Sequence, residues 1–197
     1  MPLSELDISR VPLHRRQITM DGYERADGLF DIEAHLVDTK SYPFDNMDRG
    51  TIEPGEALHG MWVRLTVGED MVIRACEAVS DFTPYTICPK VAANFSALAG
   101  VLIGPGFNRA VKDRVGGVLG CTHLREVMAQ MATVAYQTIG PRKWRRLKAE
   151  RDARIAAGDA SLPPPRTLPI GSCYAYAEDS PVVRRHRERN GDLPADE

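Results

Sequence analysis

The sequence predicts an α+β fold, in which a curved antiparallel sheet is followed by two or three helices packed on one of its faces. From about Arg15 to Ala78 the residues alternate between apolar and polar, as they do in half-buried strands. Later in the chain the apolar residues are spaced by three and four, which is the spacing of amphipathic helices. Strands that come first, with no crossover helix between them, favour an antiparallel sheet.

The strands are expected to form two hairpins. The clearest alternation places Phe30, Ile32, Ala34 and Leu36 on one face of a strand. We predict strands at residues 15–25 and 29–38, joined by 26–28, and at 59–67 and 71–78, joined by 68–70. The polar stretch 39–56, which contains two prolines and two glycines, predicts a long loop between the hairpins.

The longest predicted helix begins at Thr122, directly after a glycine-rich stretch. Its apolar stripe consists of Leu124, Val127, Met128, Met131, Val134 and Ala135. Gly140-Pro141 predicts the end of this helix, because proline lacks the backbone N–H that a helix interior needs. Shorter helices are expected at 90–103 and 107–115. We therefore expect this long helix to provide the main helical part of the core.

The domain prediction is a single α+β domain over residues 15–177. Residues 1–14 are expected to form an N-terminal arm, and 178–197 a charged C-terminal tail. The proline-rich stretch 158–169 predicts a linker, and 172–176 a short edge strand.

Composition limits the classes of function. The 197 residues carry a formal net charge of -2, which gives no field that would attract nucleic acid or an anionic membrane. The basic residues between Arg142 and Arg154 are interrupted by acidic ones, so a solvent-exposed helix face is favoured over RNA binding. No apolar run is long enough to cross a bilayer. We expect a cytoplasmic protein that binds neither nucleic acid nor membrane; association into a homo-oligomer stays open.

Cys121 and His123 are the first candidates for chemistry. They lie at the predicted start of the long helix, where unpaired backbone N–H groups and the helix dipole favour a negatively charged thiolate. The same dipole disfavours a protonated imidazole, which would keep His123 able to accept a proton. A small buried cysteine beside an N-cap threonine is the structural alternative.

A shared site is expected from residues at the ends of different segments. His59 opens the third strand, Cys88 follows the second hairpin, and Cys121 and His123 precede the long helix. Cysteine and histidine are the ligands that zinc prefers. These four residues are therefore the candidate metal ligands, and the cofactor prediction is either none or one metal ion, zinc or iron.

A second group of polar residues lies along the first hairpin and near strand ends. Tyr23 and Arg25 precede the first turn, Asp38 and Lys40 end the second strand, and Asp81 follows the fourth. Such residues supply acid–base groups or hold a polar substrate.

Several of these stretches together resemble the bacterial domain-of-unknown-function family 2889 (DUF2889). The resemblance rests on Tyr23 to Gly28, Asp31 to Lys40, Gly55 to Met61, and Gly120-Cys121-Thr122-His123-Leu124, and extends to about Ala177. It implies an association with bacterial breakdown of aromatic, lignin-derived compounds.

The resemblance favours an enzyme, a lyase that acts on a small aromatic compound. In one form it removes a hydroxymethyl group as formaldehyde without a cofactor. His59 or His123 takes the hydroxyl proton, Asp81 orients that histidine, and Cys121 is a further catalytic residue. Tyr23 and Arg25 hold the phenolate, and the other expected substrate-binding residues are Asp38, Lys40 and Cys88.

The alternative function is a metal-binding or iron–sulfur scaffold that uses His59, Cys88 and Cys121. The order of these residues along the chain is similar to the layout of NifU-type and SufE-type scaffold proteins. Those scaffolds carry cysteine where this chain carries His59.

Overall fold

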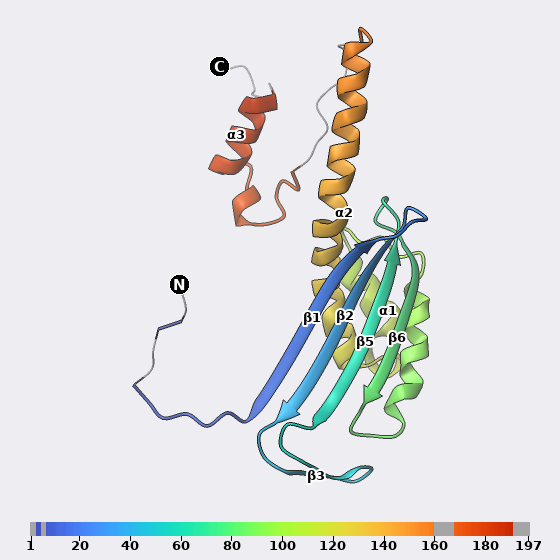
Figure 1. Ribbon diagram of the computed structural model, residues 1–197, viewed down its shortest axis with the longest axis vertical. Coiled ribbons are helices and arrows are strands. Elements are labelled where there is room, and N and C mark those ends of the chain that lie inside the picture. The colour runs from blue at the N-terminus through green and yellow to red at the C-terminus, as the bar shows by residue number, and fades with distance from the viewer. Residues whose placement is uncertain (1–2, 5–6, 160–167, 191–197) are drawn as a thin grey trace. The chain divides into compact units, whose positions relative to one another are not determined.

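A computed structural model describes residues 3–4, 7–159 and 168–190 of the chain (Figure 1). The strands are β1 (His14–Glu24), β2 (Phe30–Lys40), β3 (Phe44–Asn46), β4 (Gly50–Ile52), β5 (Ala57–Val67) and β6 (Ile73–Phe82). The helices are η1 (Cys88–Leu98), α1 (Phe107–Val115), η2 (Gly117–Leu119), α2 (Thr122–Ala156), η3 (Tyr174–Tyr176) and α3 (Pro181–Asn190), where η denotes a 3₁₀-helix. The predicted α+β fold is confirmed.

The main sheet has four antiparallel strands in the order β1-β2-β5-β6. Both predicted hairpins are present, and β2 also pairs with β5, which joins the hairpins into one sheet. The ladder between β2 and β5 shifts register at Asp38/Thr39, close to the end of β2. A bulge of this kind bends the strand locally and changes where its side chains point.

The core lies between one face of this sheet and the helices that follow it. Alternate residues of β2 are buried from Phe30 to Leu36, as the alternation predicts. Helix α2 contributes Leu124, Val127, Met128, Met131, Ala135 and Ile139 to the same cluster. On the other face of the sheet, polar side chains such as Glu33 and Arg64 form exposed ion pairs. One face is therefore apolar and the other polar, as in a two-layer domain.

The close approach of β1 to α2 depends on Gly22. A Cβ atom at this position would lie 1.9 Å from Oγ1 of Thr138, well inside van der Waals contact. An Asp-Gly dipeptide commonly marks a turn or a bulge, but Asp21 and Gly22 here lie within the strand β1.

Three predicted elements differ from the structure in type. The helix predicted at 90–103 is the 3₁₀-helix η1, and its buried residues Ala92, Phe95 and Leu98 are spaced by three, the 3₁₀ period. The predicted loop 39–56 contains the short hairpin β3-β4. Residues 174–176 form a 3₁₀ turn where an edge strand was expected.

Helix α2 does not end at Gly140-Pro141 but includes Pro141. Proline removes one helical hydrogen bond, and the residues that follow are mostly good helix formers. Arg146 pairs with Glu150, and Lys148 with Asp152, at the (i, i+4) spacing that supports a helix. The single proline at 141 therefore does not outweigh the helix propensity of the residues that follow it.

The chain separates into two compact units, residues 1–140 and 141–197. In the second unit, α3 begins after Ser180, whose hydroxyl accepts from the backbone N–H of Val183 at 3.2 Å. Part of the expected C-terminal tail is thus helical, while residues 191–197 lie outside the described residues, as do 160–167 of the predicted linker. Among the described residues no helix is both long and apolar enough to span a membrane.

Candidate functional site

The carboxylate of Asp38 lies at the centre of a group of basic side chains. Arg16 donates from Nε and Nη2 to its two oxygens, both at 2.8 Å, and Nδ1 of His59 lies 3.1 Å from Oδ2. Nε2 of His14 and Nε2 of His123 lie 3.5 and 3.6 Å from its oxygens. The Asp38 side chain is only 1% exposed, so these groups replace water around it. We call these five residues the Asp38 cluster.

Strand register explains why the members from the sheet meet. Arg16 pairs with Asp38 across β1 and β2, and Asp38 pairs with His59 across β2 and β5. Residues opposite each other in an antiparallel ladder share a face of the sheet. Asp38 and His59 lie on the same face of the sheet as the buried residues Leu36 and Met61, so the cluster lies at the end of the core.

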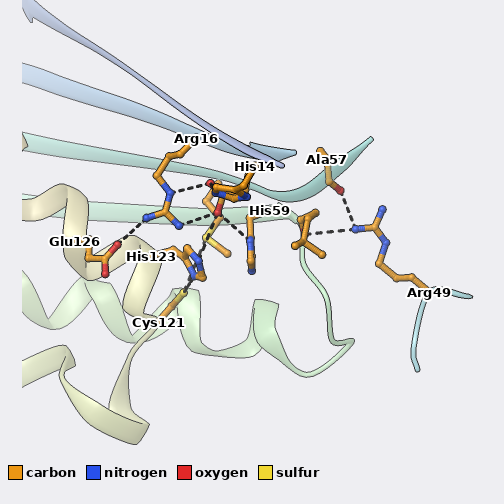
Figure 2. A network of polar contacts seen from close by, with 11 residues as sticks. His14, Arg16, Arg49, Ala57, His59, Cys121, His123 and Glu126 are labelled. Carbon is orange, nitrogen blue, oxygen red and sulfur yellow. Dashed lines mark hydrogen bonds and ion pairs between the residues drawn. The ribbon is translucent and has the colours of Figure 1, made fainter. Parts of the chain in front are cut away.

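Arg16 also connects the sheet to α2. Its Nη1 donates to Oε2 of Glu126 at 2.8 Å, while the rest of the guanidinium binds Asp38 (Figure 2). One side chain therefore holds the position of a β2 carboxylate relative to the first turns of α2.

The start of α2 is fixed by a tight backbone turn. A Cβ at Gly120 would lie 1.8 Å from the carbonyl oxygen of Val115, the last residue of α1, so only glycine fits there. The turn places Cys121 and His123 against the sheet: Sγ of Cys121 lies 3.9 Å from Nδ1 of His123 and 4.0 Å from Sδ of Met61. Figure 2 shows His123 beside His59 and Cys121 next to it.

The charges in the cluster are set by burial and by Arg16. Burial alone would raise the pKa of Asp38, but the hydrogen bonds and charge of Arg16 outweigh burial, so the pKa is lowered and the carboxylate is ionised. Burial, together with the charge of His123, lowers the pKa of His59 to about 4. Burial and the charge of Arg16 also lower the pKa of His123. At neutral pH the cluster therefore contains one carboxylate, one guanidinium and neutral imidazoles at His59 and His123.

This charge state determines which nitrogen of His59 carries the proton. A neutral ring whose Nδ1 lies 3.1 Å from an ionised carboxylate donates its Nδ1–H, which leaves Nε2 with a free lone pair. In His123, Nε2 lies 3.6 Å from the same carboxylate, beyond hydrogen-bond length, and Nδ1 lies 3.9 Å from the thiol of Cys121. Each ring thus keeps one basic nitrogen.

The structure brings four of the predicted site residues together. Three of the four residues that were predicted to share a site, His59, His123 and Cys121, lie together, and the Asp38 carboxylate lies beside both histidines. The carboxylate next to the two histidines is that of Asp38 and not that of Asp81. Asp81 is an exposed residue of β6.

Tyr23 and Arg25 lie at the other end of the first hairpin. Tyr23 pairs with Asp31 and Arg16 with Asp38, and Asp38 lies seven positions after Asp31 in β2, which is about 23 Å at the rise of a strand. Arg25 binds Asp27 at 2.7 Å. Tyr23 and Arg25 lie at the turn of the β1-β2 hairpin, whereas the histidines lie at its open end. The structure therefore does not bring these two residues to the histidines.

Lys40 contacts other residues, and Cys88 lies at the start of η1. Nζ of Lys40 lies 3.1 Å from the hydroxyl of Tyr42 and over the ring of Phe44. Cys88 is a half-buried residue at the start of η1. Neither belongs to the group of possible metal ligands that the described residues form.

That group consists of Asp38, His59 and His123, whose ligand atoms lie within 4.8 Å of one another. A carboxylate and two neutral imidazoles suit zinc or iron in their chemistry. Both oxygens of Asp38 already accept from Arg16, however, so a guanidinium charge lies where a cation would bind. The donor set fits a metal only if Arg16 moves away from Asp38.

Sequence reasoning missed His14, Arg16 and Glu126. One signal was available: Asp38 is in phase with the apolar face of β2, and a buried carboxylate requires a charged or hydrogen-bonded partner. Arg16 is similarly in phase with Ile18 and Met20, which pack against the core. The pairing of the two strands in register would then have predicted the ion pair.

A shallow hollow of about 410 Å³ lies between α1 and α2. It is lined by Asn108, Val111, Lys112, Arg125, Glu126, Met128 and Ala129. Glu126 connects it to the Asp38 cluster through Arg16.

Comparison with known proteins assigns the chain to a family. No curated protein and no solved structure matches the chain, so the likeness to NifU-type and SufE-type scaffolds stays a prediction. The family described as "Protein of unknown function (DUF2889)" matches residues 14–137, more than half of the chain. The match begins at His14 and includes every residue of the Asp38 cluster. The chain belongs to the DUF2889 family.

Proposed function

We propose that the protein is an enzyme that uses the Asp38 cluster for general acid–base catalysis on a small molecule. The observation that carries the proposal is the contact of 3.1 Å between Nδ1 of His59 and the buried carboxylate of Asp38. A carboxylate that accepts one imidazole N–H fixes the ring and stabilises the imidazolium that forms when the other nitrogen takes a proton. His59 is the general base in this proposal, and Asp38 positions it.

The reaction that we propose is a lyase reaction on a small, lignin-derived aromatic compound. The substrate class is supported by what the resemblance to the DUF2889 family implies. Nε2 of His59 takes the proton of a hydroxymethyl group, the carbon–carbon bond breaks, and formaldehyde leaves. The electron pair passes to the neighbouring carbon, which is conjugated with the ring and then receives the proton back. Atoms and charges balance without a cofactor.

The test uses phenolic compounds whose side chains carry a hydroxymethyl group, with formaldehyde release as the measurement. The wild-type protein should release formaldehyde from at least one of them, and His59→Gln should reduce the rate by roughly 100-fold or more. His35→Gln is the matched control, because His35 stacks on Trp62 on the opposite face of the sheet and should keep full activity. Equal rates in wild type and His59→Gln would contradict the proposal. A product formed without formaldehyde would keep the acid–base role and overturn the lyase reaction.

A metal-binding function is the second candidate, and the spacing of Asp38, His59 and His123 within 4.8 Å favours it. The bidentate hold of Arg16 on Asp38 opposes it. Calorimetric titration with zinc and with ferrous iron separates the two functions. Stoichiometric binding that is lost in His59→Gln and kept in His35→Gln would support the metal site, and it should strengthen in Arg16→Gln. Absence of binding in all four proteins would leave acid–base catalysis as the function of the cluster.

A further inference from the structure

We propose that Cys121 is a nucleophile activated by His123 and Asp38, and that it adds to the carbonyl carbon of an aldehyde. Sγ of Cys121 lies 3.9 Å from Nδ1 of His123, and Nε2 of the same ring lies 3.6 Å from the Asp38 carboxylate. The three groups are thus in the order thiol, imidazole, carboxylate. This inference rests on the proposed function in one respect only, that the Asp38 cluster is the site of catalysis.

The order of these groups is that of a nucleophile, its base and the residue that orients the base. The geometry fits this order, because Nδ1 of His123 faces the thiol while Nε2 of the same ring faces the carboxylate. Contacts of this kind are commonly longer before a substrate binds than in the reacting complex. His59 contacts the same carboxylate separately, so Asp38 serves two histidines with different tasks.

The position of the thiol also allows a substrate to reach it. Cys121 is half-buried, and it precedes the first turn of α2, where the first backbone N–H groups have no partner within the helix. Such N–H groups stabilise an oxygen on which negative charge develops. Cys76, in contrast, is buried in the core, and burial raises its pKa to about 12.

The proposed step needs no further reactant. The thiol proton moves to Nδ1 of His123, a bond forms between Sγ and the carbonyl carbon, and the π bond of the carbonyl breaks. The carbonyl oxygen then takes the proton from His123, which gives a hemithioacetal. Nothing is oxidised or reduced, and the reaction reverses by the same path. Addition to an aldehyde needs only the one proton that passes from the thiol through His123 to the carbonyl oxygen, and it needs neither a leaving group nor a water molecule to complete the reaction.

The first experiment measures nucleophilicity with iodoacetamide on the full-length protein, and peptide mass spectrometry follows each cysteine over time. Cys121 should be alkylated at least 10-fold faster at pH 7 than the exposed Cys173, which is the internal reference. His123→Gln and Asp38→Asn should reduce the rate at Cys121 toward that of Cys173, and Asp38→Glu should restore part of it. A rate at Cys121 equal to that at Cys173, or one that His123→Gln leaves unchanged, overturns the proposal.

The second experiment identifies the electrophile with benzaldehyde labelled with ¹³C at the carbonyl. Wild-type protein should convert the carbonyl signal in part to that of a tetrahedral carbon, and Cys121→Ser should not. An equal adduct in Cys121→Ser, or no adduct in the wild type, overturns the assignment to aldehydes. Neither experiment depends on the lyase reaction. Loss of formaldehyde release in His59→Gln with unchanged alkylation of Cys121 would therefore separate the two proposals.

Discussion

The imidazole rings of His59 and His123 pack against each other, with centroids 3.9 Å apart and planes inclined by 32°. One ring comes from β5 and the other from the first turn of α2, so the contact exists only when sheet and helix are assembled. Two imidazolium charges at this distance would repel each other strongly, which disfavours double protonation. The pair therefore accepts one proton at a time, as acid–base catalysis requires.

Replacing His123 should change the titration of His59. The charge of His123 is one cause of the lowered pKa of His59, second to burial. His123→Gln removes this repulsion, so the pKa of His59 should rise. The measurement is an NMR titration of the His59 ring, with His35→Gln as the control that leaves it unchanged. A pKa of His59 that does not move in His123→Gln would show that burial and the charge of Arg16 account for the shift without His123.

Stability should fall with decreasing pH between about 6.5 and 4. Burial and the charge of His123 lower the pKa of His59 from 6.5, its ordinary value in an unfolded chain, to about 4 in the folded protein, so over this range the unfolded chain binds more protons than the folded one. Since the shift opposes protonation, stability is highest above pH 6.5 and decreases as the unfolded state takes up the proton. The difference should reach about 3 kcal/mol for this residue. Urea unfolding at several pH values measures it, and His59→Gln should show a shallower dependence.

Removing the charge of Asp38 should destabilise the protein. In Asp38→Asn the hydrogen-bond acceptors at the centre of the cluster are weakened, and Arg16 loses its buried counter-ion. We expect the free energy of unfolding to fall by about 2 to 4 kcal/mol, somewhat less than for a fully buried ion pair that loses one partner, because the Arg16 side chain is 32% exposed. Glu33→Gln is the matched control, because Glu33 pairs with Arg64 on the exposed face of the sheet and should cost less than about 1 kcal/mol. Equal effects of the two substitutions in urea unfolding would contradict a central role of Asp38.

The contact between β1 and α2 can be tested at Gly22. Gly22→Ala places a Cβ atom within 1.9 Å of Oγ1 of Thr138, so the helix or strand must shift, at about 1 to 3 kcal/mol. Thr138→Ala should recover part of this loss in the double variant, because the two residues are in contact. Gly140→Ala is the control, since a Cβ there would meet no atom within 4 Å beyond the adjacent residues and the backbone of its own helix, and alanine favours helix. Additive effects at Gly22 and Thr138 would rule out the predicted contact.

Local patterns in the sequence determined the elements that depend on neighbouring residues. The alternation from Phe30 to Leu36 predicted β2, and the three-and-four spacing from Leu124 predicted the buried face of α2. The glycine-rich stretch before Cys121 also marked the start of that helix correctly. These features follow from the periods of strand and helix, which a few residues are enough to establish.

Only the tertiary structure decided which polar residues share a site. Arg16, Asp38, His59 and His123 are far apart along the chain and meet because the register of three strands and the approach of α2 place them at one end of the core. Periodicity does not specify which end of a hairpin lies next to a helix. The sequence therefore predicted Tyr23 and Arg25 as site residues, although the Asp38 cluster lies at the opposite end of β2. The prediction that α2 ends at Pro141 was wrong for a related reason. A proline removes one helical hydrogen bond, whereas the continuation of α2 depends on many residues on both sides of Pro141.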